Sequence, residues 1–291
     1  LEIFQSLYKG RWIISISSLL FSFFCLIYSF FLPNIYESKT LLNPVDPMSS
    51  ISGALESFGG LASLAGIDIP QNNLNNASKA LEKLNSLSFF ENEILPEIFL
   101  PELMAVKSWN YKKNSLLFDS DIYDIDSESW VRKFSYPQKK IPSAQESFEE
   151  FHENHFDVSE DKLSGFVTLS IKHQSPFIAE TWSKLVVNKI NSFYRDKDKL
   201  EAEIAIKYLN EQMLKTNFAE IKQALAELLK SEIQKLTLIE ANELYVFDYI
   251  DPPAVMEEKA EPSRLLITIV GFLIGLIFGI SFILFRFYKS K

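Results

Sequence analysis

The sequence predicts a membrane-anchored α+β fold, with two transmembrane helices flanking an outer α/β base that carries a long protruding helical hairpin. Three observations lead to this fold class. Two runs without a charged residue lie near the ends of the 291-residue chain, at 13–32 and 265–285. Segments of alternating polarity between them indicate strands. Residues 177–251 contain neither glycine nor proline, which indicates a long helical region.

Each uncharged run is long enough to cross a bilayer as a helix. At 1.5 Å per residue both runs reach about 30 Å, the thickness of the hydrocarbon layer. A core helix of a soluble protein rarely stays uncharged on every side over this length. A cleaved signal peptide would end in small residues, which Leu32-Pro33-Asn34-Ile35 does not supply. We therefore expect transmembrane helices at 13–32 and 265–285.

Basic residues flank both runs on the side of the chain ends. Lys9 and Arg11 precede the first run, and Arg286, Lys289 and Lys291 follow the second. Basic residues collect on the cytoplasmic side of a membrane. This predicts cytoplasmic segments at 1–12 and 286–291, with the long middle region on the other side.

Composition excludes several classes of protein. A net charge of −9 disfavours a nucleic-acid partner. One cysteine, Cys25, allows no disulfide framework and no multi-cysteine metal site. His152-Glu153-Asn154-His155 spaces its histidines three apart instead of four, and the aspartates of 119–126 lack the glycine and terminal glutamate of a calcium loop. We expect a solvated helix face and an acidic turn there, and no catalytic, cofactor-binding or metal-binding residue.

Residues 33–175 are expected to form the α/β base. Residues 35–42 and 165–173 alternate as strands do, and 245–251 is expected to join their sheet. Residues 52–67 hold four of the nine glycines without the Gly-Lys-Ser/Thr ending of a phosphate loop, which predicts short helix and turn pieces. Residues 76–95 space their apolar side chains by three and four, which predicts one amphipathic helix closed by Pro96.

Residues 176–244 are expected to form the helical hairpin. Their composition favours helix, and an apolar seam at coiled-coil spacing slips once in phase. The seam consists of Leu214, Phe218, Ile221, Leu225 and Leu228, then Leu229, Ile233 and Leu236. Because 245–251 returns to the sheet, the helical region must reverse. N-cap patterns at 217–220 and 231–234 leave two places open for the turn.

Two motifs surround the second span. Pro252, Pro253 and Pro262 lie in a connector at 252–264, and each fixes φ and lacks an N–H, which predicts a stiff membrane-proximal link. Gly271, Gly275 and Gly279 are four residues apart, a spacing that lets transmembrane helices approach closely. The partner helix could be the chain's own first span or a second membrane protein. Alternatively, these glycines only reflect the frequency of glycine in membrane helices.

In their order along the chain, these pieces resemble the chain-length determinant (Wzz-type) polysaccharide co-polymerases of bacterial inner membranes. The resemblance is carried by the first span running into 32–38, by 61–67, by the strand, proline and helix at 165–194, and by 251–264 before a glycine-repeat span. The sequence departs from the family pattern at Met256 and Ala260, where prolines are common, and in its short outer domain.

The resemblance implies a non-enzymatic regulator of the length of a lipid-linked glycan (O-antigen, capsule or a related polymer) that a separate membrane polymerase makes. It also implies an inner-membrane location with a periplasmic main domain, contact with membrane lipid and lipid-linked polysaccharide, and a homo-oligomeric ring of about eight protomers. The alternative is a two-span periplasmic sensor or scaffold protein. A sensor would carry a cytosolic output module, which the sequence does not contain, and a hydrolase would need a nucleophile–base set, which we do not find.

Overall fold

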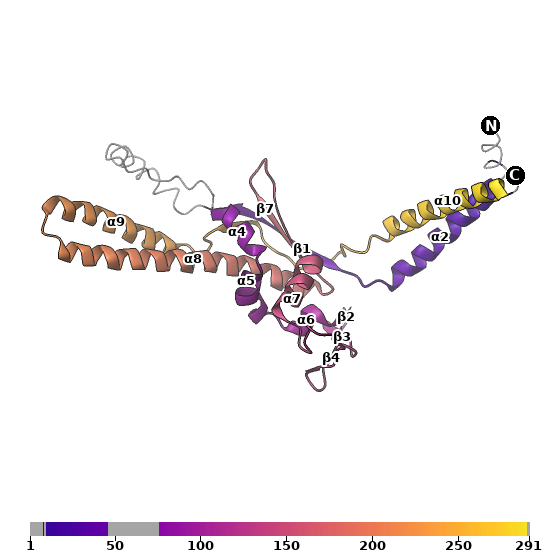
Figure 1. The fold of residues 1–291 in the computed structure, drawn as a ribbon, viewed down its shortest axis with the longest axis horizontal. Helices are drawn as coiled ribbons and strands as arrows, with labels where there is room; N and C mark the ends of the chain where they lie inside the picture. The colour runs from indigo at the N-terminus through magenta and orange to yellow at the C-terminus, as the bar shows by residue number, and fades with distance from the viewer. Residues whose placement is uncertain (1–7, 9, 46–75, 290–291) are drawn as a thin grey trace.

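The computed structural model describes residues 8, 10–45 and 76–289 and shows an elongated molecule with three parts (Figure 1). Helices α2 (Arg11–Phe31) and α10 (Arg264–Lys289) run side by side at one end. A sheet with flanking helices forms the middle, and helices α8 and α9 extend from it at the opposite end. The glycine-containing segment 52–67, expected as short helix and turn pieces, lies outside the described residues.

Helices α2 and α10 correspond to the two predicted spans. Both are long and apolar enough to cross a membrane, over Arg11–Phe31 and Arg264–Arg286. Only 11% and 22% of their most apolar windows are buried, so most of these apolar side chains face outward. A core helix of a soluble protein would bury such side chains, and a bilayer is the environment that fits them.

The central sheet is antiparallel and has the strand order β6-β7-β1-β8. Its strands are β1 (Tyr36–Pro44), β6 (Phe156–Glu160), β7 (Val167–His173) and β8 (Phe247–Asp251). β1 pairs with β7 from Tyr36↔His173 to Leu42↔Val167, and with β8 from Leu41↔Asp251 to Pro44↔Phe247. The three segments expected to form strands therefore lie in one sheet, and β6 is an edge strand that the sequence pattern did not reveal.

The first half of α8 (Pro176–Lys215) covers this sheet and forms the core with it. β7 contributes the alternating, fully buried side chains of Val167, Leu169 and Ile171. The facing side of α8 is just as deeply buried and holds Ala179, Trp182, Val186, Val187 and Ile190. A buried hydrogen bond of 2.8 Å between the hydroxyls of Thr40 and Ser183 joins β1 to α8. The sheet and the first half of α8 therefore pack as two layers around one core.

The prediction of a single helix at 76–95 is wrong. The structure has α4 (Asn76–Leu84), a break, and then α5 (Leu87–Phe89), the π-helical turn η1 (Phe90–Ile94) and the 3₁₀ turn η2 (Leu95–Glu97). Ser86 is extended at the break, and its Oγ accepts the N–H of Phe89 at 3.3 Å as an N-cap. The break and the wide turn allow both Phe89 and Phe90, neighbours in sequence, to enter the core.

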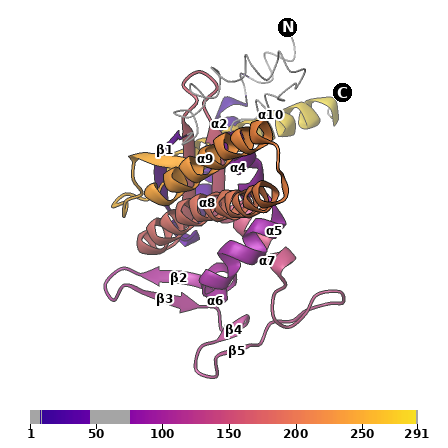
Figure 2. The same cartoon turned by 90° about the vertical axis from the view of Figure 1, so that its left-hand side faces the viewer.

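Two small hairpins lie beside the base (Figure 2). They follow α6 (Leu100–Met104) and consist of β2 (Val106–Asn110) with β3 (Ser115–Phe118), and β4 (Tyr123–Asp124) with β5 (Ser129–Trp130). The aspartates of 119–126 lie around β4, and two of them accept backbone N–H groups within their own turns, Asp119 from Asp121 and Asp124 from Asp126. They therefore stabilise turns, as expected.

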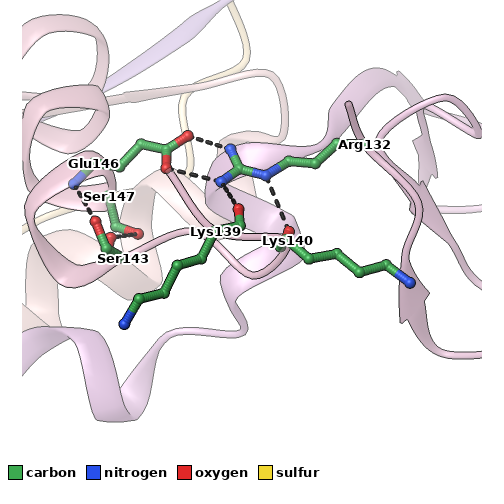
Figure 3. A network of polar contacts seen from close by, with 6 residues as sticks. All are labelled: Arg132, Lys139, Lys140, Ser143, Glu146 and Ser147. Carbon is green, nitrogen blue, oxygen red and sulfur yellow. Dashed lines mark hydrogen bonds and ion pairs between the residues drawn. The ribbon is translucent and has the colours of Figure 1, made fainter. Parts of the chain in front are cut away.

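Arg132 joins the loop after β5 to helix α7 (Ala144–Glu150), as Figure 3 shows. Its guanidinium donates to both carboxylate oxygens of Glu146 and to the carbonyl oxygens of Lys139 and Lys140, the latter two at 2.6 and 3.0 Å. The Ser143 hydroxyl caps α7 by accepting the Glu146 N–H at 3.2 Å. Because the guanidinium lowers the pKa of the Glu146 carboxyl, the pair stays ionised and fixes the loop.

Helix α8 continues beyond the sheet and runs beside α9 (Ala219–Ala241). The chain reverses at residues 216–218, the first of the two places left open by the sequence, but the N-cap of α9 is Phe218 and no side chain caps it. The expected apolar seam is only partly buried. Leu214, Phe218, Ile221, Leu228 and Ile233 are 48–87% exposed. Leu225, Leu229 and Leu236 are half-buried, and Leu236 packs against the core.

The side chain of Asn191 holds the returning chain against α8. Its Oδ1 accepts the backbone N–H groups of Tyr245, Val246 and Phe247 at 3.1, 2.7 and 2.9 Å. Its Nδ2 donates to the Phe247 carbonyl oxygen at 3.0 Å. Asn191 is 2% exposed, so no water can replace these bonds at low cost. The amide therefore fixes where β8 begins.

We predict that Asn191→Ala destabilises the protein by about 3 kcal/mol, because it leaves several buried backbone groups without a partner. Denaturant unfolding of the full chain in detergent measures this loss. Asn188→Ala, three residues earlier on the exposed side of α8, is the matched control and should leave stability unchanged. Equal losses in the two variants would show that the Asn191 bonds do not hold β8 in place.

Candidate membrane interface and connector

The three glycines expected to mediate a helix contact lie on the side of α10 that meets α2. A Cβ atom at Gly271 would be 2.7 Å from the Cβ and Sγ of Cys25. At Gly275 it would be 2.7 Å from the Cα of Ser18, and at Gly279 2.9 Å from the Cα of Ile14. These distances are too short for any side chain at the three positions. The backbones of α2 and α10 therefore approach as closely as small-residue packing allows.

Serines of α2 add polar contacts that the sequence analysis missed. Ser17 Oγ donates to the carbonyl oxygen of Gly275 at 2.9 Å, and Ser22 Oγ donates to that of Thr268 at 3.3 Å. Hydroxyl groups in a membrane helix need a nearby acceptor, and a glycine carbonyl is accessible because no side chain covers it. The serines are visible in the sequence within the uncharged run. Their hydrogen-bond acceptors lie on another helix, so the sequence pattern could not reveal the contacts.

The connector at 252–264 runs back along the chain that leads from α2 into β1. Ile35 N–H donates to the Glu261 carbonyl oxygen at 2.9 Å, and Ala260 N–H donates to the Ile35 carbonyl oxygen at 2.9 Å. Ser38 Oγ donates to the Ala254 carbonyl oxygen at 3.1 Å. The two chain segments that lead to the membrane helices are therefore hydrogen-bonded to each other.

The predicted prolines of the connector occupy different environments. Pro253 is buried, Pro262 is half-buried and Pro252 is exposed. Close to Pro262, Lys172 at the end of β7 binds the Glu261 carboxylate at 2.6 Å, and this contact raises the pKa of the Lys172 ammonium. The connector is thereby attached both to the start of β1 and to the end of β7.

The histidines expected on a solvated helix face lie against the sheet instead, which corrects that expectation. Both belong to the π-helical turn η3 (Phe151–His155), which packs on β6 and β7. His155 Nδ1 lies 2.7 Å from the Lys172 carbonyl oxygen, and its ring centroid is 5.6 Å from those of His173 and Trp182. His152 packs edge-on against Phe156 at 5.1 Å. The wide turn is what brings both rings onto the base.

A third histidine, His173, is buried beside His155. Burial lowers the pKa of His173 to about 4, so its ring is neutral near neutral pH. Its Nε2 lies 3.1 Å from the Glu102 carbonyl oxygen, and its Nδ1 accepts the Ser175 N–H at 2.9 Å. Among the described residues, no group of three or more His, Cys, Asp or Glu side chains could hold a metal ion.

The described structure thus has two apolar helices, each long enough to cross a membrane, that pack along each other and are joined through a hydrogen-bonded connector to one sheet. The sequence model of the chain length determinant protein family (Wzz) matches residues 1–94 of this chain. The match confirms the resemblance described above for the first span, β1, α4, α5 and η1, which is about the first third of the sequence.

Two solved structures match this chain at low sequence identity and low TM-score. One is a full-length bacterial polysaccharide co-polymerase, with 12% sequence identity, 99% of this chain and 97% of that chain covered, and a TM-score of 0.39. The other is a fragment of WzzB, a polysaccharide co-polymerase from Salmonella Typhimurium, with 12% identity, 78% and 100% coverage, and a TM-score of 0.31. A search among curated proteins gives no match.

We predict that Gly275→Val separates α2 from α10, because the added Cβ would lie 2.7 Å from the Ser18 Cα and 2.8 Å from the Ser17 carbonyl oxygen, and backbone atoms cannot yield. Cys25 is the only cysteine of the chain and lies in the same contact, so its labelling reports the separation. Maleimide labelling of the full chain in detergent should become several-fold faster.

Ile277→Phe is the control for this measurement, because Ile277 is 64% exposed and points away from α2. It enlarges a side chain of α10 without touching the contact. Unchanged labelling in Gly275→Val, or equally faster labelling in Ile277→Phe, would contradict the close packing of the two helices.

Proposed function

We propose that this protein is a non-enzymatic regulator of polysaccharide chain length that acts with a separate membrane polymerase on a lipid-linked glycan. The match of residues 1–94 to the chain length determinant family carries the proposal. The second apolar helix supports it, because it lies against the first and gives the chain the two spans that the resemblance implies.

The proposed orientation has both chain ends in the cytoplasm and the base in the periplasm of a bacterial inner membrane. Arg11 at the start of α2 and Arg286 and Lys289 at the end of α10 support it, since basic residues stay on the cytoplasmic side. In this orientation the base follows directly outside the membrane, where a lipid-linked glycan is extended.

The protein is further proposed to work as a ring of identical subunits, from which α8 and α9 protrude as a helical hairpin. Support comes from the apolar side chains that these helices leave exposed, among them Leu214, Phe218, Ile221 and Leu228. Apolar groups on an extended helix pair are typical of a surface that a second copy covers. In this arrangement Gly271, Gly275 and Gly279 serve the contact between the two spans of one subunit.

The proposed function predicts that cells without this gene lose the banded length distribution of a surface polysaccharide. A gel profile of lipid-linked polysaccharide from cells with and without the gene measures this. The expected result is a modal distribution that changes to unregulated short chains on deletion and returns on complementation. An unchanged profile, with sugar content and amount also unchanged, would overturn the proposal and favour a periplasmic sensor or scaffold.

The connector is proposed to transmit the state of the base to the membrane helices, because its prolines restrict the backbone between them. Replacing both Pro252 and Pro253 by Ala should broaden or shift the modal length in the same gel assay while the protein remains present in the membrane. Pro137→Ala, in an exposed loop far along the chain from the connector, is the control. Wild-type lengths in the double variant would contradict a role of connector stiffness.

A further inference from the structure

A hollow of about 340 Å³ lies between the β2–β3 hairpin, the start of α6 and the start of α8. Its volume falls at the small end of the range for small-molecule sites, roughly 300–1,000 Å³. The residues around it come from three separate parts of the sequence, so no local sequence motif predicts it. It is distinct from the α2–α10 contact, and it borders His173, whose ring contacts backbone atoms of Glu102 and Ser175.

Aromatic side chains form the walls of the hollow. Trp109 on β2 lies 6.4 Å from Phe177 at the start of α8, measured between ring centroids. Phe177 and Phe99 are 44% and 52% exposed, although both are large apolar side chains. The Trp109 indole is fixed in place, because its Nε1 donates to Asn114 Oδ1 at 3.0 Å. The result is a rigid aromatic surface that is open to a ligand.

Polar groups without a protein partner line the same hollow. Ser175 is 2% exposed, and although it is the N-cap residue of α8 its side chain makes no capping hydrogen bond. The Glu102 carboxylate has no hydrogen-bond or ion-pair partner among the described residues. Burial raises the pKa of this carboxyl. A half-buried carboxylate and a hydroxyl without a partner among the described residues are available here to a ligand that carries hydroxyl groups.

From these two sets of groups, we propose that the hollow binds a single neutral sugar ring of a glycan. The proposal rests on the function proposed above, which it deepens by naming a contact site. A sugar ring has an apolar C–H face that packs on Trp109 and hydroxyl groups that donate to the Glu102 carboxylate and bind Ser175. A purely apolar ligand would bury Glu102 unpaired. An anionic group would be repelled by the same carboxylate.

The position of the hollow fits a glycan held at the membrane. Trp109 packs edge-on against Tyr36, with the ring centroids 5.5 Å apart. Tyr36 is the first residue of β1 and follows the end of α2, Phe31, by five positions. The hollow is therefore at the end of the sheet from which the chain enters helix α2, which in the proposed orientation is the end nearest the sugars next to a lipid anchor.

Binding can be measured with the full chain in lipid nanodiscs and short oligosaccharides released from the surface polysaccharide of the same cells. Saturation-transfer NMR reports which sugar protons contact the protein, and a titration gives Kd. We expect Trp109→Ala to weaken binding about tenfold, the size of a lost aromatic contact with its buried area. Glu102→Gln should weaken binding several-fold, because a neutral amide is a weaker acceptor than a carboxylate.

Tyr111→Ala is the matched control, since Tyr111 is in the same hairpin, is 71% exposed and does not line the hollow. It should bind like the wild type. No binding by the wild type, or equal weakening in Trp109→Ala and Tyr111→Ala, would overturn the proposal. Cross-linking of Phe177→Cys to a peptide of a second copy would also overturn it, because the hollow would then be a protein interface.

The sugar-binding test and the gene-deletion test can fail independently of each other. If deletion of the gene changes the gel profile but the hollow binds no sugar, the sugar site is wrong and the regulator stands. If the hollow binds sugar but deletion leaves the profile unchanged, the sugar site stands and the regulator is wrong.

Discussion

The four hydrogen bonds of the Asn191 side chain are the constraint on which the rest of the structure depends. They join the middle of α8 to the three residues at which the returning chain enters β8. A second contact, from Tyr245 Oη to Asp198 Oδ2 at 2.7 Å, acts about two helical turns further along α8. Because the start of β8 is fixed to α8, the long helical region must reverse and cannot continue as one rod.

Fixing β8 also fixes the path to the membrane. β8 lies beside β1, and β1 leads back to α2 while β8 leads through the connector to α10. The hydrogen bonds between Ile35 and residues 260–261 bring the two paths together again before they reach the spans. The ion pair between Lys172 and Glu261 attaches the end of β7 to the same contact between Ile35 and residues 260–261. A movement of the sheet therefore reaches both membrane helices at one place, not at two independent tethers.

The sequence predicted features that depend on local patterns and missed those that depend on distant partners. Alternation identified β1 and β7, whose buried faces are continuous, but β6 exposes most of its residues and left no such pattern. The break at Ser86 overrides a regular apolar spacing because an N-cap and a π turn bury Phe89 and Phe90 together. Gly275 was found from its spacing, whereas its partner Ser17 could not be found without the helix pair. The hollow near Trp109 joins residues more than 60 positions apart, which no spacing rule reveals.

The aromatic hollow and the connector are linked through two neighbouring residues. Tyr36 packs on Trp109, and the preceding residue, Ile35, forms the bridge to Glu261. A ligand on Trp109 can influence the membrane helices only if it binds two arrangements of this joint with different affinity, because equal affinity shifts no equilibrium. One peptide unit separates the two contacts, so an arrangement that shifts the backbone at Tyr36 also shifts the Ile35 bridge. In the proposed orientation, such a backbone shift is the physical route by which the base could act on the two apolar helices.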